Sequence, residues 1–348
     1  MPDLINSSHY VWAGTVSEYP FCEIDTIELV KRIKNKISQG CTSIIFDTMY
    51  EGFYPDIVKK LHRIINLVDC PEVTYHYVTA ALNGKEAYQL HCDRNGVNPC
   101  LNMISMSTFE MTSKGHLDHY YVTNNEPHVK YTPGIKDKLF VCFNKICRKH
   151  RTLIFHRILT GNLLERSYTS FEPGLDVIQR LSRYGDPGRM LPVFKQYKNI
   201  FPLRLNVPKG RHNPIDVRKE DIAYHETSYF SLVTETVFFR DDFDSGDSIF
   251  LTEKTFRPIH FKHPFILLSS AGSLEYLRKL GYKTFHPFIN ESYDLEMDDN
   301  RRFEKVWKEV LRLCSFSEGE WLGWQKEIAP ILEHNYNVFW NKNNYVLS

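Results

Sequence analysis

The sequence lacks paired cysteines, an excess of charge of either sign and a long apolar run. Its eight cysteines show no C-x-x-C spacing, so neither a zinc cage nor a disulfide framework is indicated. With 43 basic and 42 acidic residues the formal net charge is +1, which argues against a protein held to nucleic acid mainly by phosphate neutralisation. No stretch approaches the roughly 20 apolar residues of a membrane helix, and the first residues lack a signal-peptide pattern. We therefore expect a cytoplasmic protein without a membrane span.

Three sequence motifs are also missing. There is no P-loop, no G-x-G-x-x-G and no G-x-S-x-G, so kinase, simple dehydrogenase and serine-hydrolase functions lose their main support. The composition is that of a folded globular chain, with 42% hydrophobic and 24% charged residues. A length of 348 residues exceeds what one hydrophobic core usually serves, and this predicts two domains.

The first part of the chain alternates helix and strand signals. Asp25 and Thr26 followed by Glu28 form a capping signature for a helix that Gly40 ends. Apolar runs predict strands at residues 42–47 and 73–78, and an apolar stripe predicts a helix over residues 56–67. Strands alternating with helices predict parallel pairing and a doubly wound sheet.

The same alternation restarts after a segment rich in Pro, Gly, Asn and charge at residues 124–137, which predicts domains 1–135 and 136–348. Strands are predicted at residues 138–143, 229–239, 264–268 and 282–285, and helices at residues 148–159, 273–280, 301–314 and 318–332, with residues 250–259 passing from a loop into a helix. The fold class is therefore α/β with two Rossmann-like domains. We expect a ligand in the crevice at the carboxyl ends of their strands.

The segment FNKICRKHR, residues 143–151, passes from a predicted strand into a predicted helix. Backbone N–H groups and the helix dipole favour an anion there, and Arg148, His150 and Arg151 add donors that suit phosphate oxygens. The alternative is a solvated basic turn. Because cations at a helix N-terminus oppose the dipole, a bound diphosphate is the better interpretation.

A second polar segment, FLTEKTFRPI at residues 250–259, also enters a helix. Thr252 is placed to cap this helix, Glu253 to accept hydrogen bonds from sugar hydroxyls, and Lys254 to neutralise a phosphate. An ordinary capped helix with solvated charges is the alternative. Spacing alone does not decide between them.

The segments at residues 140–164, 228–239, 250–285 and 289–294 resemble uncharacterised glycosyltransferase-like proteins of tailed bacteriophages and large viruses. The T-E-K-x-F element is similar to the donor-site motif of the α1,3-fucosyltransferase family. The resemblance covers residues 138–340 and implies a GT-B-like fold, with two domains facing a central cleft, and transfer of a sugar from a UDP- or GDP-sugar. It also implies that Glu253 and Lys254 contact the donor, and a viral source would mean the cytoplasm of the host.

The implied donor site comprises Asn144, Arg148, His150, Arg151, Glu235, Thr252, Glu253 and Lys254, in the C-terminal domain. Fixed cations there would stabilise the leaving diphosphate without a metal or other cofactor. For Glu235, an exposed position on a half-buried strand is the alternative. Inversion, if the fucosyltransferase similarity holds, requires a general base in the N-terminal acceptor-side domain. Glu51 is the first candidate and Asp47 the second, with turn formation and helix capping as alternative roles.

Other interpretations stay open. Asp242 and Asp244 form a D-x-D that can bind the metal of a GT-A glycosyltransferase, although a solvated acidic loop is preferred. His116, Asp118 and His119 lack zinc-site partners at the usual spacing. The acceptor can be a glycan, a protein or modified DNA, but the basic run at residues 31–36 lies on an amphipathic helix and is better explained as a solvated face. A catalytically inactive nucleotide- or glycan-binding module is the alternative from a different functional class.

Overall fold

The computed structural model describes residues 26–124, 129–145, 148–171, 219–240 and 248–347, together with residues 192, 194–196, 199 and 203. Contacts group the chain into two compact units. Unit 1 comprises Met1–Met111, Arg240–Leu251 and Asn343–Ser348, and unit 2 comprises Thr112–Phe239 and Thr252–Lys342. The chain therefore passes between the units at four points, one of which lies directly before Thr252.

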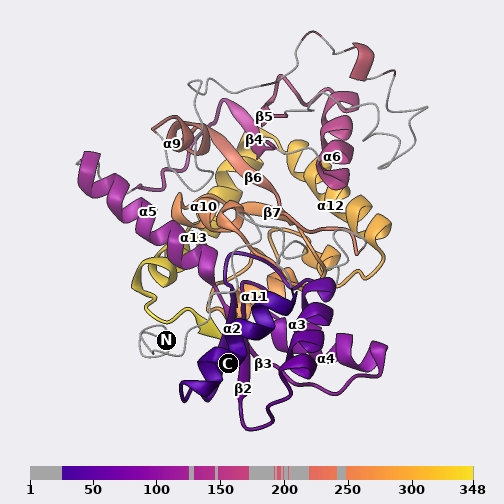
Figure 1. Cartoon of the computed structure of the whole chain (residues 1–348). Coiled ribbons are helices and arrows are strands. Elements are labelled where there is room, and N and C mark those ends of the chain that lie inside the picture. Colours follow the sequence, from indigo (N-terminus) through magenta and orange to yellow (C-terminus); the bar gives the residue numbers. More distant parts are fainter. Residues whose placement is uncertain are drawn as a thin grey trace. The chain divides into compact units, whose positions relative to one another are not determined.

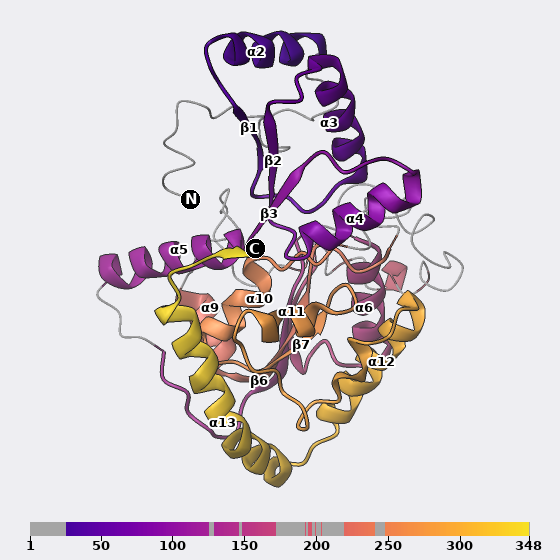
Figure 2. The same cartoon turned by 90° about the horizontal axis from the view of Figure 1, so that it is seen from below.

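Unit 1 is built on a sheet with the strand order β1-β2-β3-β8 (Figures 1 and 2). The strands are β1 (Ser43–Thr48), β2 (Thr74–Thr79), β3 (Asn102–Met106) and β8 (Val346–Leu347). The first three are parallel, whereas β8 pairs antiparallel with β3. Helices α3 (Pro55–Val68) and α4 (Gly84–Asn95) supply the crossovers that these parallel strands require, and α2 (Thr26–Ser38) precedes β1.

The core of unit 1 forms between the helices and the sheet. Ile33 of α2, Ile64 of α3 and Phe46 of β1 are all fully buried in one cluster. Gly84 opens α4 at a point of close approach, where its N–H donates to Ser105 Oγ at 3.0 Å. A Cβ atom at this position would lie 2.7 Å from that oxygen, so only glycine allows α4 to begin so close to β3.

Unit 2 contains a second sheet, in which all four strands are parallel in the order β5-β4-β6-β7. The strands are β4 (Lys138–Phe143), β5 (Ser167–Ser170), β6 (Ser228–Thr234) and β7 (Phe265–Leu268). The helices are α6 (Lys149–Thr160), α9 (Lys219–Glu226), α10 (Glu253–His260), α11 (Ser273–Lys279), α12 (Asp299–Cys314) and α13 (Glu318–Asn341), with a short 3₁₀ helix, η3 (Glu291–Tyr293). Helix α5 (Thr108–Asn124) carries the chain from unit 1 into unit 2.

Every residue of β6 is buried, as expected for a central strand covered on both faces. Trp321 of α13 stacks on Tyr229 of β6 with the ring centroids 4.1 Å apart, which fixes this helix against the sheet. Together with the parallel sheets, this packing confirms the predicted α/β class with two Rossmann-like units. The predicted central cleft and the predicted boundary at residue 135 stay predictions.

Three predicted elements differ from the structure. Residues 282–285 are not a strand, because side chains take up their backbone groups: Lys283 N–H donates to Asn335 and Phe285 N–H to Glu291. The predicted strand over residues 229–239 ends at Thr234, because the carbonyl oxygen of the next residue, Glu235, accepts a hydrogen bond from His150 and not from a neighbouring strand. The last helix continues past residue 332 to Asn341, with Pro330 inside it. Within the described part of the chain, no helix combines the length and the apolar character needed to cross a membrane.

Candidate functional site

The predicted donor-site residues of unit 2 gather where β4 and β6 end. These strands are parallel neighbours, so Asn144, directly after β4, and Glu235, directly after β6, emerge at the same edge of the sheet. Thr234 Oγ1 donates to Asn144 Oδ1 at 2.7 Å and ties the two strand ends together. Asn144 is therefore a buried link between strands, only 2% exposed.

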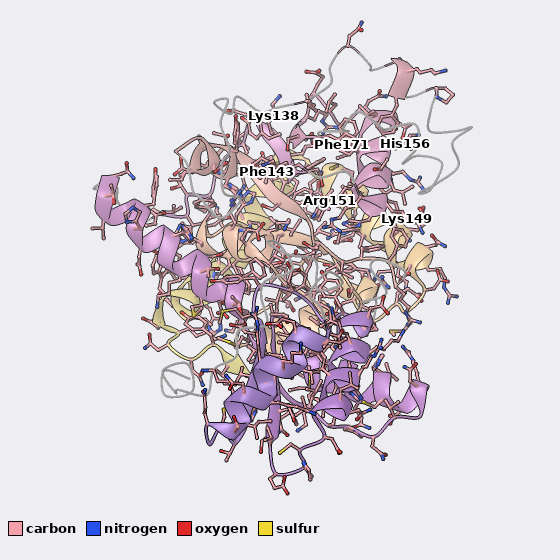
Figure 3. All side chains as sticks on the ribbon, viewed as in Figure 1. Lys138, Phe143, Lys149, Arg151, His156 and Phe171 are labelled. Atoms are coloured by element: carbon pink, nitrogen blue, oxygen red, sulfur yellow. The ribbon has the colours of Figure 1, made fainter. Side chains whose placement is uncertain are left out.

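The first turn of α6 carries only basic ionisable side chains and packs against the end of β6. His150 donates from Nε2 to the carbonyl oxygen of Glu235 at 2.8 Å, which fixes the tautomer of this ring. Arg151 Nη2 donates to the same oxygen at 3.0 Å and to the carbonyl oxygen of Thr234 at 3.2 Å. Figure 3 shows Arg151 and Lys149 at one end of α6, with His156 further along the helix. Two basic side chains thus lie inside the protein, on backbone carbonyls.

Burial and mutual repulsion shape the charges of this turn. Burial lowers the pKa of Arg151 to about 10, and the positive charge of Arg148 adds to the shift. Burial also lowers the pKa of His150 well below its usual value, helped by the charge of Arg151, so His150 is neutral. The charges of Arg148 and Arg151 therefore disfavour one another in this turn.

Glu235 connects the two polar segments predicted from the sequence. Its carbonyl holds His150 and Arg151, while its fully buried carboxylate accepts four hydrogen bonds. Oε1 accepts from Thr252 N–H at 2.8 Å and Thr255 Oγ1 at 2.6 Å, and Oε2 accepts from Thr252 Oγ1 at 2.7 Å and Thr236 N–H at 3.1 Å. Glu235 therefore fixes the N-terminus of α10 relative to the N-terminus of α6.

The T-E-K element opens α10, as predicted, with Thr252 at the N-cap position. The hydroxyl of Thr252 does not cap the helix, because it donates to Glu235 and accepts from Lys254 Nζ at 2.8 Å. Lys254 Nζ also donates to Glu253 Oε1 at 2.9 Å, and its side chain is 28% exposed. Burial raises the pKa of Glu253, but the charge and hydrogen bond of Lys254, together with the charge of Arg257 and a backbone hydrogen bond, outweigh burial, so the net pKa is lowered. Lys254 is thus a positioned cation that reaches solvent.

The two candidate bases belong to unit 1, at the end of β1. Asp47 is only 8% exposed, and its Oδ1 accepts from Met49 N–H at 2.8 Å, as in a carboxylate that shapes its own turn. Glu51 is half-buried, and its Oε2 accepts from Tyr54 Oη at 3.2 Å. The backbone of Glu51 is held on both sides, by Thr48 O and by the N–H of Ala80. The geometry therefore favours Glu51 over Asp47 as an accessible carboxylate.

Of the two metal-binding alternatives predicted from the sequence, only one lies in the described residues. Asp242 and Asp244 lie outside the described residues. His116, Asp118 and His119 lie on α5, and no three His, Cys, Asp or Glu side chains in the described part of the chain gather into a metal-binding group. A cavity of about 710 Å³ lies elsewhere in unit 2, along α11 and η3, and none of its lining residues is a predicted site residue.

Sequence reasoning did not foresee two features of the site. One is Thr255, whose hydroxyl completes the shell around Glu235. The other is the position of Glu235 at the centre of the network. An ionisable residue directly after a run of seven buried strand residues is the available signal, because a buried carboxylate requires several donors.

Comparison with known proteins gives a distant likeness in fold. The sequence matches no protein-family profile and no curated protein. Among solved structures, the chain is similar to an α,α-trehalose 6-phosphate synthase from Burkholderia multivorans, with 10% identity, a TM-score of 0.44, and coverage of 95% of this chain and 68% of that one. It is also similar to a UDP-forming α,α-trehalose-phosphate synthase from Burkholderia vietnamiensis, with 11% identity, a TM-score of 0.46, and coverage of 95% and 72%.

Proposed function

We propose that the protein is a glycosyltransferase of GT-B type and that unit 2 binds the diphosphate of a nucleotide-sugar donor. The observation that carries this proposal is the first turn of α6, which has four consecutive basic residues, 148–151, and no acidic one. The turn lies beside the network that holds Lys254. The similarity of the T-E-K element to the fucosyltransferase donor motif supports the same ligand.

Among the described residues, two further helix N-termini at this edge of the sheet already hold carboxylates. Glu235 occupies the N-terminus of α10 through Thr252 N–H. Asp294 occupies that of α11, where its two carboxylate oxygens accept from Leu274 N–H at 3.0 Å and Glu275 N–H at 3.2 Å. The dipoles of α10 and α11 are therefore satisfied from within the protein. The N-terminus of α6 carries basic side chains, whereas the N-termini of α10 and α11 hold carboxylates. The N-terminus of α6 is therefore the one that suits the anion of a ligand.

The proposed chemistry follows from where charge develops. As the bond between sugar and diphosphate breaks, negative charge grows on the leaving phosphate oxygens. Half-exposed Arg148 and Lys254 are placed to bind these oxygens directly. Buried His150 and Arg151 donate hydrogen bonds to the end of β6, and they act by holding this strand end in place and, for Arg151, by the electrostatic field of its charge. Cations fixed before the reaction stabilise the transition state more than the ground state.

The acceptor side of the proposal lies in unit 1. An inverting reaction needs a carboxylate that removes the proton of the acceptor hydroxyl as the sugar carbon is attacked. We assign this role to Glu51, since Asp47 is engaged by its own turn. The cations of unit 2 would take the place of a metal, and the donor would be a UDP- or GDP-sugar.

A thermal-shift panel tests donor binding. UDP, GDP, ADP and CDP are compared with the corresponding nucleosides, which lack the phosphates. A ligand at 100 times its Kd stabilises the folded protein by about 2.7 kcal/mol, so at least one diphosphate should raise Tm while its nucleoside does not. Arg148→Ala should remove the shift, and Arg278→Ala on α11 should keep it. If no diphosphate raises Tm, the donor site is wrong.

A further inference from the structure

Unit 1 presents an exposed aromatic ring beside its candidate base. Tyr50 directly precedes Glu51 and is 40% exposed. Its ring makes an edge contact with Phe109, with the centroids 6.4 Å apart and an interplanar angle of 82°. Phe109 in turn makes an edge contact with buried Phe250 at 5.5 Å and 78°. A T-shaped contact covers at most one face of a ring, so at least one face of Tyr50 is not covered by Phe109.

The turn that carries Tyr50 is fixed from two directions. On one side, Glu51 O accepts from Ala80 N–H at 2.9 Å and from Thr79 Oγ1 at 3.0 Å, which ties the turn to the end of β2. On the other side, Phe53 N–H donates to Ser248 Oγ at 3.4 Å. A Cβ atom on Gly52 would lie 3.5 Å from the ring of Phe250, so this glycine already packs closely on the ring. The aromatic ring is therefore displayed on a preorganised turn.

We propose that Tyr50, supported by Phe109 and Phe250, binds the face of a sugar ring, and that the acceptor is a glycan whose hydroxyl reaches Glu51. The apolar C–H face of a pyranose buries against an aromatic ring, and a carboxylate accepts charge-assisted hydrogen bonds from its hydroxyls. We call this group of three rings the Tyr50 platform. Its use by an acceptor rests on the proposed function, whereas sugar binding itself does not.

The charge around the Tyr50 platform selects against other ligands. The turns that follow β1, β2 and β3, at residues 49–54, 80–83 and 107–110, contain no Lys or Arg, so a phosphate or another anion finds no cation there. A stable protein interface buries about 800 Å² on each partner, far more than one half-exposed ring provides. A neutral polyhydroxylated ring matches both the size and the charge of this surface.

Saturation-transfer difference NMR on the full chain tests the proposal. The probes are the methyl pyranosides of glucose, galactose, mannose and N-acetylglucosamine, with sorbitol as a ligand that has hydroxyls but no ring. We expect transfer to the ring C–H protons of at least one pyranoside and none to sorbitol. Tyr50→Ala should weaken binding about 10-fold, the size expected for loss of one aromatic contact. Tyr50→Phe should retain it, and Tyr120→Ala on α5 is the matched control.

Two results would overturn the proposal: no pyranoside receives saturation from the wild-type protein, or Tyr50→Ala binds as well as the wild type. Thermal shifts with UDP and GDP on the same samples separate this inference from the proposed function. Sugar binding that depends on Tyr50, without any nucleotide shift, would leave the Tyr50 platform intact and remove the donor site. Nucleotide shifts without sugar binding would do the reverse.

Discussion

The two units repeat one architecture, but the segment after β4 in unit 2 and the turns after β1 and β3 in unit 1 carry charges of opposite sign. In unit 2, the segment after β4 contributes Lys145, Arg148, Lys149 and Arg151 and no acidic residue. In unit 1, the turns after β1 and β3 contribute Glu51 and Glu110 and no Lys or Arg. In both units a parallel strand is followed by a turn and a helix, so the sign of the charge at these positions depends on the side chains and not on the fold. In the proposed reaction, the segment in unit 2 binds the diphosphate and the turns in unit 1 bind the hydroxyl that loses a proton.

The largest expected effect comes from removing the proposed base in unit 1. Glu51→Gln keeps the shape of the side chain but cannot accept a proton, so transfer should slow by about 100- to 10,000-fold. Because Glu51 is not in unit 2, the Kd of UDP or GDP measured by calorimetry should not change. Glu72→Gln, at another position in unit 1, is the control. A fully active Glu51→Gln enzyme would direct attention to Asp47.

The next effect comes from removing a cation in unit 2. Lys254→Ala should lower turnover by roughly 100-fold or more, because the leaving diphosphate loses a fixed positive charge. Turnover and Tm are measured together, with Lys279→Ala on α11 as the matched surface control. Unchanged kinetics in a folded variant would remove Lys254 from the site.

A smaller effect is expected from Glu235, which we interpret as a positioning residue. Glu235→Gln replaces one acceptor oxygen by a donor, so part of its four-donor shell is left unsatisfied at a cost of about 1–3 kcal/mol. The Kd for a nucleoside diphosphate should rise, because Thr252 then no longer holds Lys254 in place. Denaturant unfolding and calorimetry measure the two effects, with exposed Glu275→Gln as control. An unchanged Kd would show that Glu235 serves the fold alone.

Acid should weaken unit 2 through its buried neutral histidines. Burial lowers the pKa of His225 to about 3, and burial also lowers the pKa of His263 well below its usual value. As the pH falls below about 6.5, these histidines bind protons in the unfolded chain but not in the folded one. The free energy of unfolding therefore decreases from that pH down to the pKa of the histidines in the folded protein. Each histidine contributes a slope of up to about 1.4 kcal/mol per pH unit.

Tryptophan fluorescence measures this loss, because Trp307, Trp321, Trp324 and Trp340 all belong to unit 2. The denaturant concentration at the unfolding midpoint should decrease as the pH is lowered from 7 to 5. An unchanged midpoint over that interval would mean that these histidines are not held neutral by the fold.

The smallest expected effect is that of chelation. If Arg148 and Lys254 supply the positive charge at the leaving group, transfer activity should be the same with and without EDTA. Complete loss with EDTA, restored by manganese, would revive the D-x-D at Asp242 and Asp244 as a metal site.

Local sequence signals predicted the elements around the site, because strand runs and capping residues act over a few positions. The strand before Asn144 and the helices after Arg148 and Thr252 could be placed in this way. The network itself could not be predicted, because Glu235 meets Thr252 only when the fold brings residues 17 apart together. At residues 282–285 the local pattern predicted a strand that does not form. The N–H groups of Lys283 and Phe285 donate to the side chains of Asn335 and Glu291 and not to a neighbouring strand.

A structure with bound UDP or GDP would locate the diphosphate in the protein. We expect the two phosphates to lie at the first turn of α6, within hydrogen-bond distance of its backbone N–H groups, Arg148 and Lys254 Nζ. A nucleotide bound elsewhere, with Arg148 and Lys254 facing bulk solvent, would contradict this prediction.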